Sequence, residues 1–151
     1  MEKYDLIIVG AGPAGIFTAV ELLRRGSKKK ILLVEKGKPV EKRHCPKAEV
    51  GHCVNCRPTC AITTGFSGAG AFSDGKLSLS YEVGGNITRY IGEERAQQLI
   101  DYADGVYVSF GAPDTVHGRN DPRVAEIAYE ASRYNIHLVR CPVRHMGTEY
   151  S

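Results

Sequence analysis

The sequence contains no hydrophobic run long enough to cross a membrane and no strong excess of one charge. Its apolar stretches all fall short of the roughly 20 residues that a membrane-spanning helix needs. Its first residues lack the apolar region and the small-residue cleavage site of a secretory signal. A formal net charge of +3 is well short of the basic stripe that favours nucleic acid. We therefore expect a cytoplasmic protein with small-molecule partners, no nucleic acid and no membrane.

Sequence patterns typical of hydrolases are absent as well. The chain has neither the G-x-S-x-G turn of a serine nucleophile nor the H-E-x-x-H pattern of a metalloprotease. It contains no internal repeat and no low-complexity tract. With 151 residues, of which 42% are hydrophobic, it can bury the core of one domain. We expect a single domain over residues 1–151.

Two short apolar runs and the helical pattern between them indicate a βαβ unit. The runs Leu6–Val9 and Ile31–Val34 are unbroken, as in strands that are buried on both faces of a parallel sheet. Between them, residues 13–25 place apolar side chains on one helical face, and Gly26 supplies the stop. This order and length predict a right-handed unit with parallel strands.

The rest of the chain is predicted to continue the alternation of helices and strands. Residues 36–90 are rich in cysteine and then in glycine, show little periodicity, and are expected to form a functional loop region. A helix is predicted from Glu93, with a strand over Val106–Phe110 after it. Asp121 is the predicted N-cap of another helix, and a strand over Ile136–Val139 follows. The sequence therefore predicts an α/β fold with a mainly parallel sheet.

A dinucleotide-binding fingerprint lies at the start of the first predicted helix. Gly10, Gly12 and Gly15 form G-x-G-x-x-G directly after a strand, where the helix N-terminus can receive a pyrophosphate. Glu35 follows the second strand, where a carboxylate can accept hydrogen bonds from ribose hydroxyls and disfavours the 2′-phosphate of NADP. FAD and NAD share the ADP group, so the fingerprint does not separate them. The residues expected at this group are Gly10, Ala11, Gly12, Pro13, Ala14, Gly15, Glu35 and Lys36.

A second glycine-rich segment covers residues 65–77. Bare backbone of this kind can lie flat against a planar ligand, and the polar groups within it can meet a flavin ring or its phosphates. The alternative is a flexible loop that holds no ligand. The residues expected to contact a flavin here are Gly70, Ser73 and Asp74, with Lys76 as a cation.

Four of the five cysteines fall within sixteen residues, at Cys45, Cys53, Cys56 and Cys60. As thiolates they are candidate ligands for zinc or for an iron–sulfur cluster. Two alternatives stay open: a redox-active thiol, or free thiols in a loop. Cys141 stands apart and is expected in the core.

Taken together, these motifs resemble those of known flavoproteins. Residues 4–15 with Glu35 resemble the large class that begins with an FAD-binding βαβ unit, and four further segments resemble the poorly characterised bacterial and archaeal FAD-dependent dehydrogenases, also described as NAD(P)/FAD-dependent oxidoreductases. The resemblance implies FAD, a small-molecule substrate, an electron acceptor and oxidoreductase activity. The four segments are Cys53–Cys56, Gly68–Leu77, Glu82–Gly85 and Arg144–Glu149.

The resemblance also implies that more chain is needed to complete the flavin site. Members of such families are much longer, so we expect the N-terminal and incomplete portion of a Rossmann-like FAD/NAD(P)-binding domain. We expect further chain, or a second chain, to complete the flavin site. Arg144 and His145 are candidates for contact with an anionic substrate or the flavin. The alternatives are an NAD-binding dehydrogenase and a non-catalytic, truncated nucleotide-binding module.

Overall fold

The computed structural model describes residues 2–147 and contains two compact units, Met1–Ser73 and Asp74–Ser151. Each unit holds both helices and strands, which confirms the predicted mixture of α and β structure. The boundary between the units falls inside the glycine-rich segment 65–77, so this segment contributes to both.

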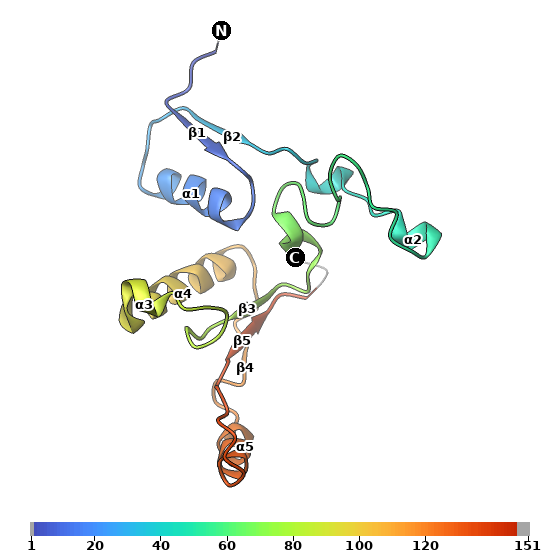
Figure 1. Ribbon diagram of the computed structural model, residues 1–151. Helices are drawn as coiled ribbons and strands as arrows, with labels where there is room; N and C mark the ends of the chain where they lie inside the picture. The colour runs from blue at the N-terminus through green and yellow to red at the C-terminus, as the bar shows by residue number, and fades with distance from the viewer. Residues whose placement is uncertain (1, 148–151) are drawn as a thin grey trace. The chain divides into compact units, whose positions relative to one another are not determined.

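The first unit begins with the predicted βαβ unit. Strand β1 (Leu6–Val9), helix α1 (Pro13–Arg24) and strand β2 (Ile31–Val34) follow one another, and α1 lies beside both strands (Figure 1). The two strands pair in parallel, from Leu6 opposite Ile31 to Val9 opposite Val34. These elements confirm the prediction to within one residue.

The β1–β2 sheet is covered on one face only. The Cβ position of Gly15 in α1 lies against the Ile8 side chain, so Ile8 faces the helix. Ile7 and Val9 point to the other face, where Val9 is 84% exposed. Apolar runs were predicted to be buried on both faces, and among the described residues this holds for neither strand. The second face of the sheet is exposed because, among the described helices, α1 is the one that packs against these strands, and it covers one face.

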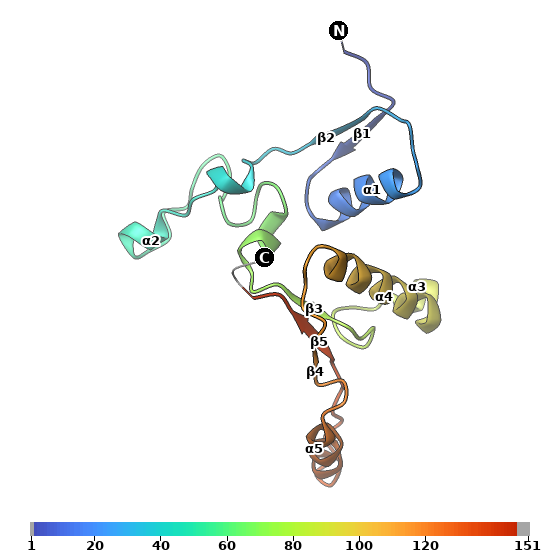
Figure 2. The same cartoon turned by 180° about the vertical axis from the view of Figure 1, so that it is seen from behind.

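The remainder of the first unit consists of short elements joined by loops. Its 3₁₀ helix η1 (Val40–Lys42) leads into an excursion over residues 44–60, which carries the four-residue helix α2 (Lys47–Val50) and returns to η2 (Gly68–Phe72). Figures 1 and 2 both show this excursion running out from η1 and back. None of residues 44–60 is buried. A loop region was predicted here, and the structure adds these short helices to it.

The second unit is built on an antiparallel sheet. Figure 2 shows its strands β3 (Lys76–Ser78), β5 (Val143–His145) and β4 (Val116–His117), which pair in the order β3–β5–β4. The helices are α3 (Thr88–Ile91), α4 (Glu93–Ser109) and α5 (Pro122–Ser132). Parallel pairing is thus confined to β1 and β2 among the described strands, and the prediction of a mainly parallel sheet is met only in part.

Two predicted strands are wrong. Val106–Phe110 is not a strand, because the apolar stripe of α4 continues past Ala103 to Val106 and Tyr107 at helical spacing, and the helix ends only at Ser109. Residues 136–139 do not form a strand, because no described strand pairs with them. The predicted N-cap is confirmed: Asp121 Oδ1 accepts a hydrogen bond from the Arg123 backbone N–H at 3.0 Å.

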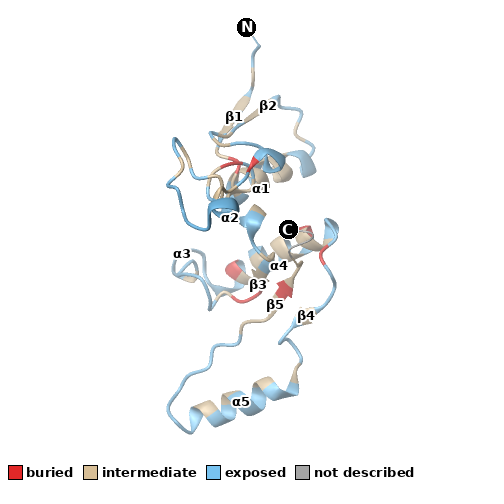
Figure 3. Ribbon diagram, turned by 90° about the vertical axis from the view of Figure 1, so that its right-hand side faces the viewer, coloured by how far each residue is buried: buried red, intermediate tan, exposed pale blue. Residues whose placement is uncertain are grey.

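Few side chains are fully buried in either unit. Figure 3 shows the buried residues in red as short patches, whereas α5 is mostly pale blue. The buried apolar residues are small or medium in size, and buried polar residues occur beside them. No helix within residues 2–147 is long and apolar enough to cross a membrane.

Candidate functional site

The glycine turn between β1 and α1 has the geometry that the fingerprint requires. Gly10 has a φ of 100°, which lies in the region that favours glycine. A Cβ on Gly15 would overlap the Gly10 carbonyl oxygen, whereas a Cβ on Gly12 would meet no atom within 4 Å. Gly15 is therefore required for packing. Gly12 is not required by the protein's own packing, so its bare backbone leaves space in front of the helix.

The first turn of α1 is open to an anion. Gly12 is its N-cap, Pro13 is its first residue, and no side chain caps it. The first turn holds no acidic residue. Free N–H groups and the positive end of the helix dipole therefore face the turn without a negative side chain of the helix itself.

The Glu35 carboxylate lies at the mouth of this turn. Its Oε2 accepts a hydrogen bond from the Ala11 N–H at 2.8 Å, and its Oε1 accepts one from the Gly37 N–H at 2.9 Å. These backbone donors, with Ala11 first, Gly37 next and Gly65 contributing less, hold the pKa of Glu35 below its ordinary value. The fingerprint acid is thus ionised and fixed next to the glycine turn, as the sequence predicts.

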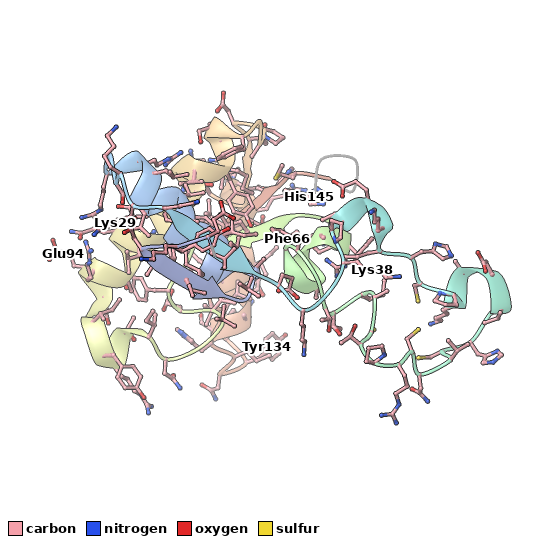
Figure 4. All side chains as sticks on the ribbon, turned by 90° about the horizontal axis from the view of Figure 1, so that it is seen from above. Lys29, Lys38, Phe66, Glu94, Tyr134 and His145 are labelled. Carbon is pink, nitrogen blue, oxygen red and sulfur yellow. The ribbon has the colours of Figure 1, made fainter. Side chains whose placement is uncertain are left out.

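A third segment closes on the same turn from the start of the glycine-rich motif. The Ser67 N–H donates to the Ala11 carbonyl at 2.8 Å, and the Phe66 N–H donates to the Lys38 carbonyl at 3.2 Å. Lys38 and Phe66 lie close together in Figure 4. A Cβ on Gly37 would overlap the backbone of Gly65, so two glycines are needed where these loops cross. Sequence reasoning did not single out either glycine for this role, although Gly37 follows the predicted site residue Lys36 and Gly65 begins the glycine-rich segment.

Arg43 joins the loops of this region through hydrogen bonds, and sequence reasoning did not single it out. Arg43 is 6% exposed. Its guanidinium donates hydrogen bonds to the carbonyls of Ala61, Ile62 and Phe66 at 2.8, 2.5 and 2.5 Å. Its Cζ also lies 4.7 Å from the centroid of the Phe72 ring. One arginine therefore ties the segment after the cysteines to the glycine-rich helix η2. A single charged residue in a loop gives no sequence signal for this role.

The remaining residues predicted at the flavin divide between the two units. Gly70 and Ser73 belong to the first unit, where the Ser73 N–H donates to the Gly70 carbonyl at 3.1 Å. Asp74 begins the second unit. Lys36 acts on Glu35 through its charge. Within the first unit, the structure thus brings the Glu35 carboxylate to the glycine turn.

Asp74 forms a small charged cluster with strands β3 and β5. Its carboxylate pairs with the Lys76 ammonium at 2.6 Å, and the hydrogen bond from Lys76 is the main cause that lowers the pKa of Asp74. His145 lies opposite Lys76 in the register, and its Nε2 is buried at 3.9 Å from Asp74 Oδ2 without a hydrogen-bond partner among the described residues. Figure 4 labels this histidine. The cluster places an ionised acid between two basic side chains.

Arg144 is not available to a substrate. It is 5% exposed, its Nε donates to Asp104 Oδ1, its Nη2 donates to Asp104 Oδ2 at 2.7 Å, and its Nη1 donates to the Pro113 carbonyl. All of these contacts are internal to the second unit. Thr148 and Glu149, which end the motif that begins at Arg144, lie outside the described residues.

The four clustered cysteines line one cavity of about 400 Å³ in the excursion. Cys53 and Cys60 are exposed and Cys45 and Cys56 are half-buried. Within residues 2–147 no three His, Cys, Asp or Glu side chains are grouped closely enough to hold a metal ion. The zinc or iron–sulfur site therefore stays a prediction. Cys141, expected in the core, is half-buried.

Comparison with known proteins gives one similar protein, whose function is not described. The chain is 40% identical over 72 residues to an uncharacterized protein of Clostridium beijerinckii. The match covers 48% of this chain and 13% of the relative, so the chain spans a small part of that protein's length. No family model matches the sequence, and no solved structure matches it. These comparisons assign neither a family nor an activity.

Proposed function

We propose that the chain is an FAD-dependent oxidoreductase, or the N-terminal part of one, and that the turn between β1 and α1 binds the ADP moiety of FAD. The observation that carries the proposal is the position of the Glu35 carboxylate, hydrogen-bonded to the Ala11 N–H at the mouth of an open glycine turn. We also propose that the domain is Rossmann-like and that further chain, or a second chain, completes its flavin site.

The residues of the first unit fit the pyrophosphate and the ribose of an ADP group. The uncapped start of α1 supplies N–H donors and dipole charge to the pyrophosphate. The ionised Glu35 accepts hydrogen bonds from the adjoining ribose hydroxyls, and its charge repels a 2′-phosphate. Gly12 lets the backbone approach the phosphates, because a side chain there would fill the space.

When bound, a flavin supplies the electron or hydride transfer, and the chain orients it. We assign Gly70, Ser73 and Asp74 to contacts with the flavin half. Ser73 and Asp74 are polar groups at the end of η2, and Gly70 offers bare backbone within it. The substrate, the electron acceptor and any acid–base residue are not assigned.

Calorimetric titration of the purified full chain with ADP, FAD and NAD, together with the visible absorbance of bound FAD, tests the proposal. We expect saturable binding of ADP and FAD and the visible absorbance of a bound flavin. Glu35→Gln should weaken the binding of ADP and the binding of FAD by about tenfold or more, since hydrogen bonds to a charged acceptor are lost. Binding of NAD with no binding of FAD would indicate an NAD-binding dehydrogenase instead.

A matched pair at Gly12 separates loss of binding from loss of folding. Gly12→Asp and Gly12→Asn introduce side chains of similar size, and both residues are favourable N-caps, so both variants should keep or raise the stability of α1. The aspartate adds a negative charge where the pyrophosphate binds. Affinity should therefore fall further for Gly12→Asp than for Gly12→Asn. Equal, unchanged affinity in both would overturn the proposed site.

A further inference from the structure

The Glu35 carboxylate keeps acceptor capacity beyond its bonds to the protein. A carboxylate offers roughly four acceptor positions, and the N–H groups of Ala11 and Gly37 each use one, at 2.8 and 2.9 Å. Ribose hydroxyls would use the capacity that remains. The place of this carboxylate therefore depends on what holds the two loops that carry Ala11 and Gly37.

Residues 65–67 contact both of these loops. The Ser67 N–H donates to the Ala11 carbonyl at 2.8 Å. The backbone of Gly65 lies against Gly37, because a Cβ on Gly37 would fall 2.4 Å from the Gly65 nitrogen. One short segment thus joins the two loops whose N–H groups bind the carboxylate.

Arg43 anchors this segment to the rest of the first unit. Its Nη1 donates to the Phe66 carbonyl at 2.5 Å, and a Cβ on Gly65 would fall 2.8 Å from its Cδ. Its Nε and Nη2 donate to the carbonyls of Ala61 and Ile62. Because the guanidinium is a planar fork, these three bonds define one orientation of the side chain. The segment that holds the two loops is therefore fixed to a buried side chain.

We propose that Arg43 is a positioning residue for nucleotide binding, which acts through residues 65–67 to keep the Glu35 carboxylate where it can accept the ribose hydroxyls. This inference rests on the proposed function and deepens it, because it names the residue on which recognition of the ribose depends. Arg43 is 6% exposed, so it acts on the ligand through Glu35 and not by contact. A site that is already ordered binds more tightly, because binding does not have to order the loops.

Calorimetric titrations of the full chain with ADP, 2′-deoxy-ADP and inorganic pyrophosphate separate the two parts of the site. Pyrophosphate tests the start of α1 alone, and the ratio of the ADP affinity to the 2′-deoxy-ADP affinity reports the hydrogen bond to the 2′-hydroxyl. We expect the wild type to prefer ADP by about tenfold, and Arg43→Met to reduce this preference to about twofold or less. The affinity of Arg43→Met for pyrophosphate should change by less than about twofold, since the start of α1 keeps its N–H groups.

Two further variants separate the position of the arginine from its charge. Arg43→Lys keeps the charge and should also lose most of the preference for ADP, since one ammonium cannot serve three carbonyls as the planar fork does. Arg25→Met is the matched control, because it removes an exposed arginine of the same unit at the other end of α1. It should keep the preference. Circular dichroism checks that each variant is folded.

The double replacement of Arg43→Met with Glu35→Gln tests whether Arg43 acts through Glu35. Each single replacement should lower the ADP affinity by about tenfold, and the double replacement should lower it no further than Glu35→Gln alone. Additive losses would overturn the inference. A preference for ADP that survives in both Arg43 variants, or a parallel loss of all three ligands in them, would also overturn it and would leave the proposed function standing. A wild-type chain that binds neither ADP nor pyrophosphate would overturn the proposed function and this inference with it.

Discussion

Each of the two units contains one buried arginine, and the two arginines are bound differently. Arg43 donates only to backbone carbonyls, and within residues 2–147 it forms no salt bridge. Arg144 is paired with the Asp104 carboxylate and donates to one carbonyl as well. The first arginine ties loops together, and the second joins β5 to α4.

Both arginines join segments of their own unit, and they differ in whether a carboxylate neutralises the charge of the guanidinium. The charge of Arg144 is neutralised within its own contact, and Asp104 responds with a lowered pKa. Carbonyl groups carry no net charge, so the charge of Arg43 still acts on its surroundings and contributes to lowering the pKa of Cys60. The first unit, which holds the glycine turn, is therefore the one whose buried arginine is not paired with a carboxylate.

The largest expected effect is at Arg144. Arg144→Met leaves the Asp104 carboxylate, 14% exposed, without its partner, and should cost about 3–5 kcal/mol of unfolding free energy in the second unit. Urea unfolding followed by hydrogen exchange, resolved to peptides of each unit, measures it.

The exposed pair of Arg133 and Glu130 provides the control, because Arg133→Met should cost no more than about 0.5 kcal/mol. The double replacement Arg144→Met with Asp104→Leu should recover part of the loss, since no unpaired charge remains. Equal costs for the two arginines would contradict the structural role assigned to Arg144.

The next effect separates two glycines of the first unit. Gly15→Ala places a Cβ against the Gly10 carbonyl and should cost about 1–3 kcal/mol, since backbone must shift to admit it. Gly12→Ala enters open space and should change the unfolding free energy by only about 0.5 kcal/mol. Thermal unfolding of both variants checks the contrast. Similar losses would show that Gly12 also has a packing role.

A smaller effect is expected at Arg43. Arg43→Lys keeps the charge but replaces a planar fork with one ammonium, which cannot serve three carbonyls in the same way. We expect a loss of about 1 kcal/mol or more in the first unit. Arg144→Lys in the second unit is the matched variant, and peptide-resolved hydrogen exchange reports each unit separately. A lysine tolerated without loss at Arg43 would show that its charge alone matters.

Local signals explain what could be predicted from the sequence. The βαβ unit, its glycine turn and the Asp121 cap depend on contacts within a few tens of residues, and all of these appear in the structure. The hydrogen bond between Glu35 and Ala11 follows from the same unit. The roles of Arg43 and Arg144 depend on loop crossings and strand pairing, which no short pattern encodes. The antiparallel pairing of β3 with β5 joins residues almost seventy positions apart and was missed for the same reason.

The smallest expected effect is a difference in acid sensitivity between the two units. Glu35 and Asp104 both have lowered pKa values in the folded chain, so each contributes stability above its unfolded pKa and loses it as pH falls through the folded pKa. Unfolding free energy should therefore begin to decrease at about pH 5, near the ordinary carboxyl pKa values, and should continue to decrease as pH falls through the lowered pKa values of the folded chain. Asp104 is paired with a buried arginine, whereas Glu35 is bound by backbone N–H groups at a more open turn, so the decrease should be steeper in the second unit.

Asp104→Asn should flatten the pH dependence of the second unit, and Glu35→Gln should flatten that of the first unit. Neither variant should change the pH dependence of the other unit. A variant that flattens both would show that the two units unfold together, and the comparison between them would then have to be made by ligand binding instead.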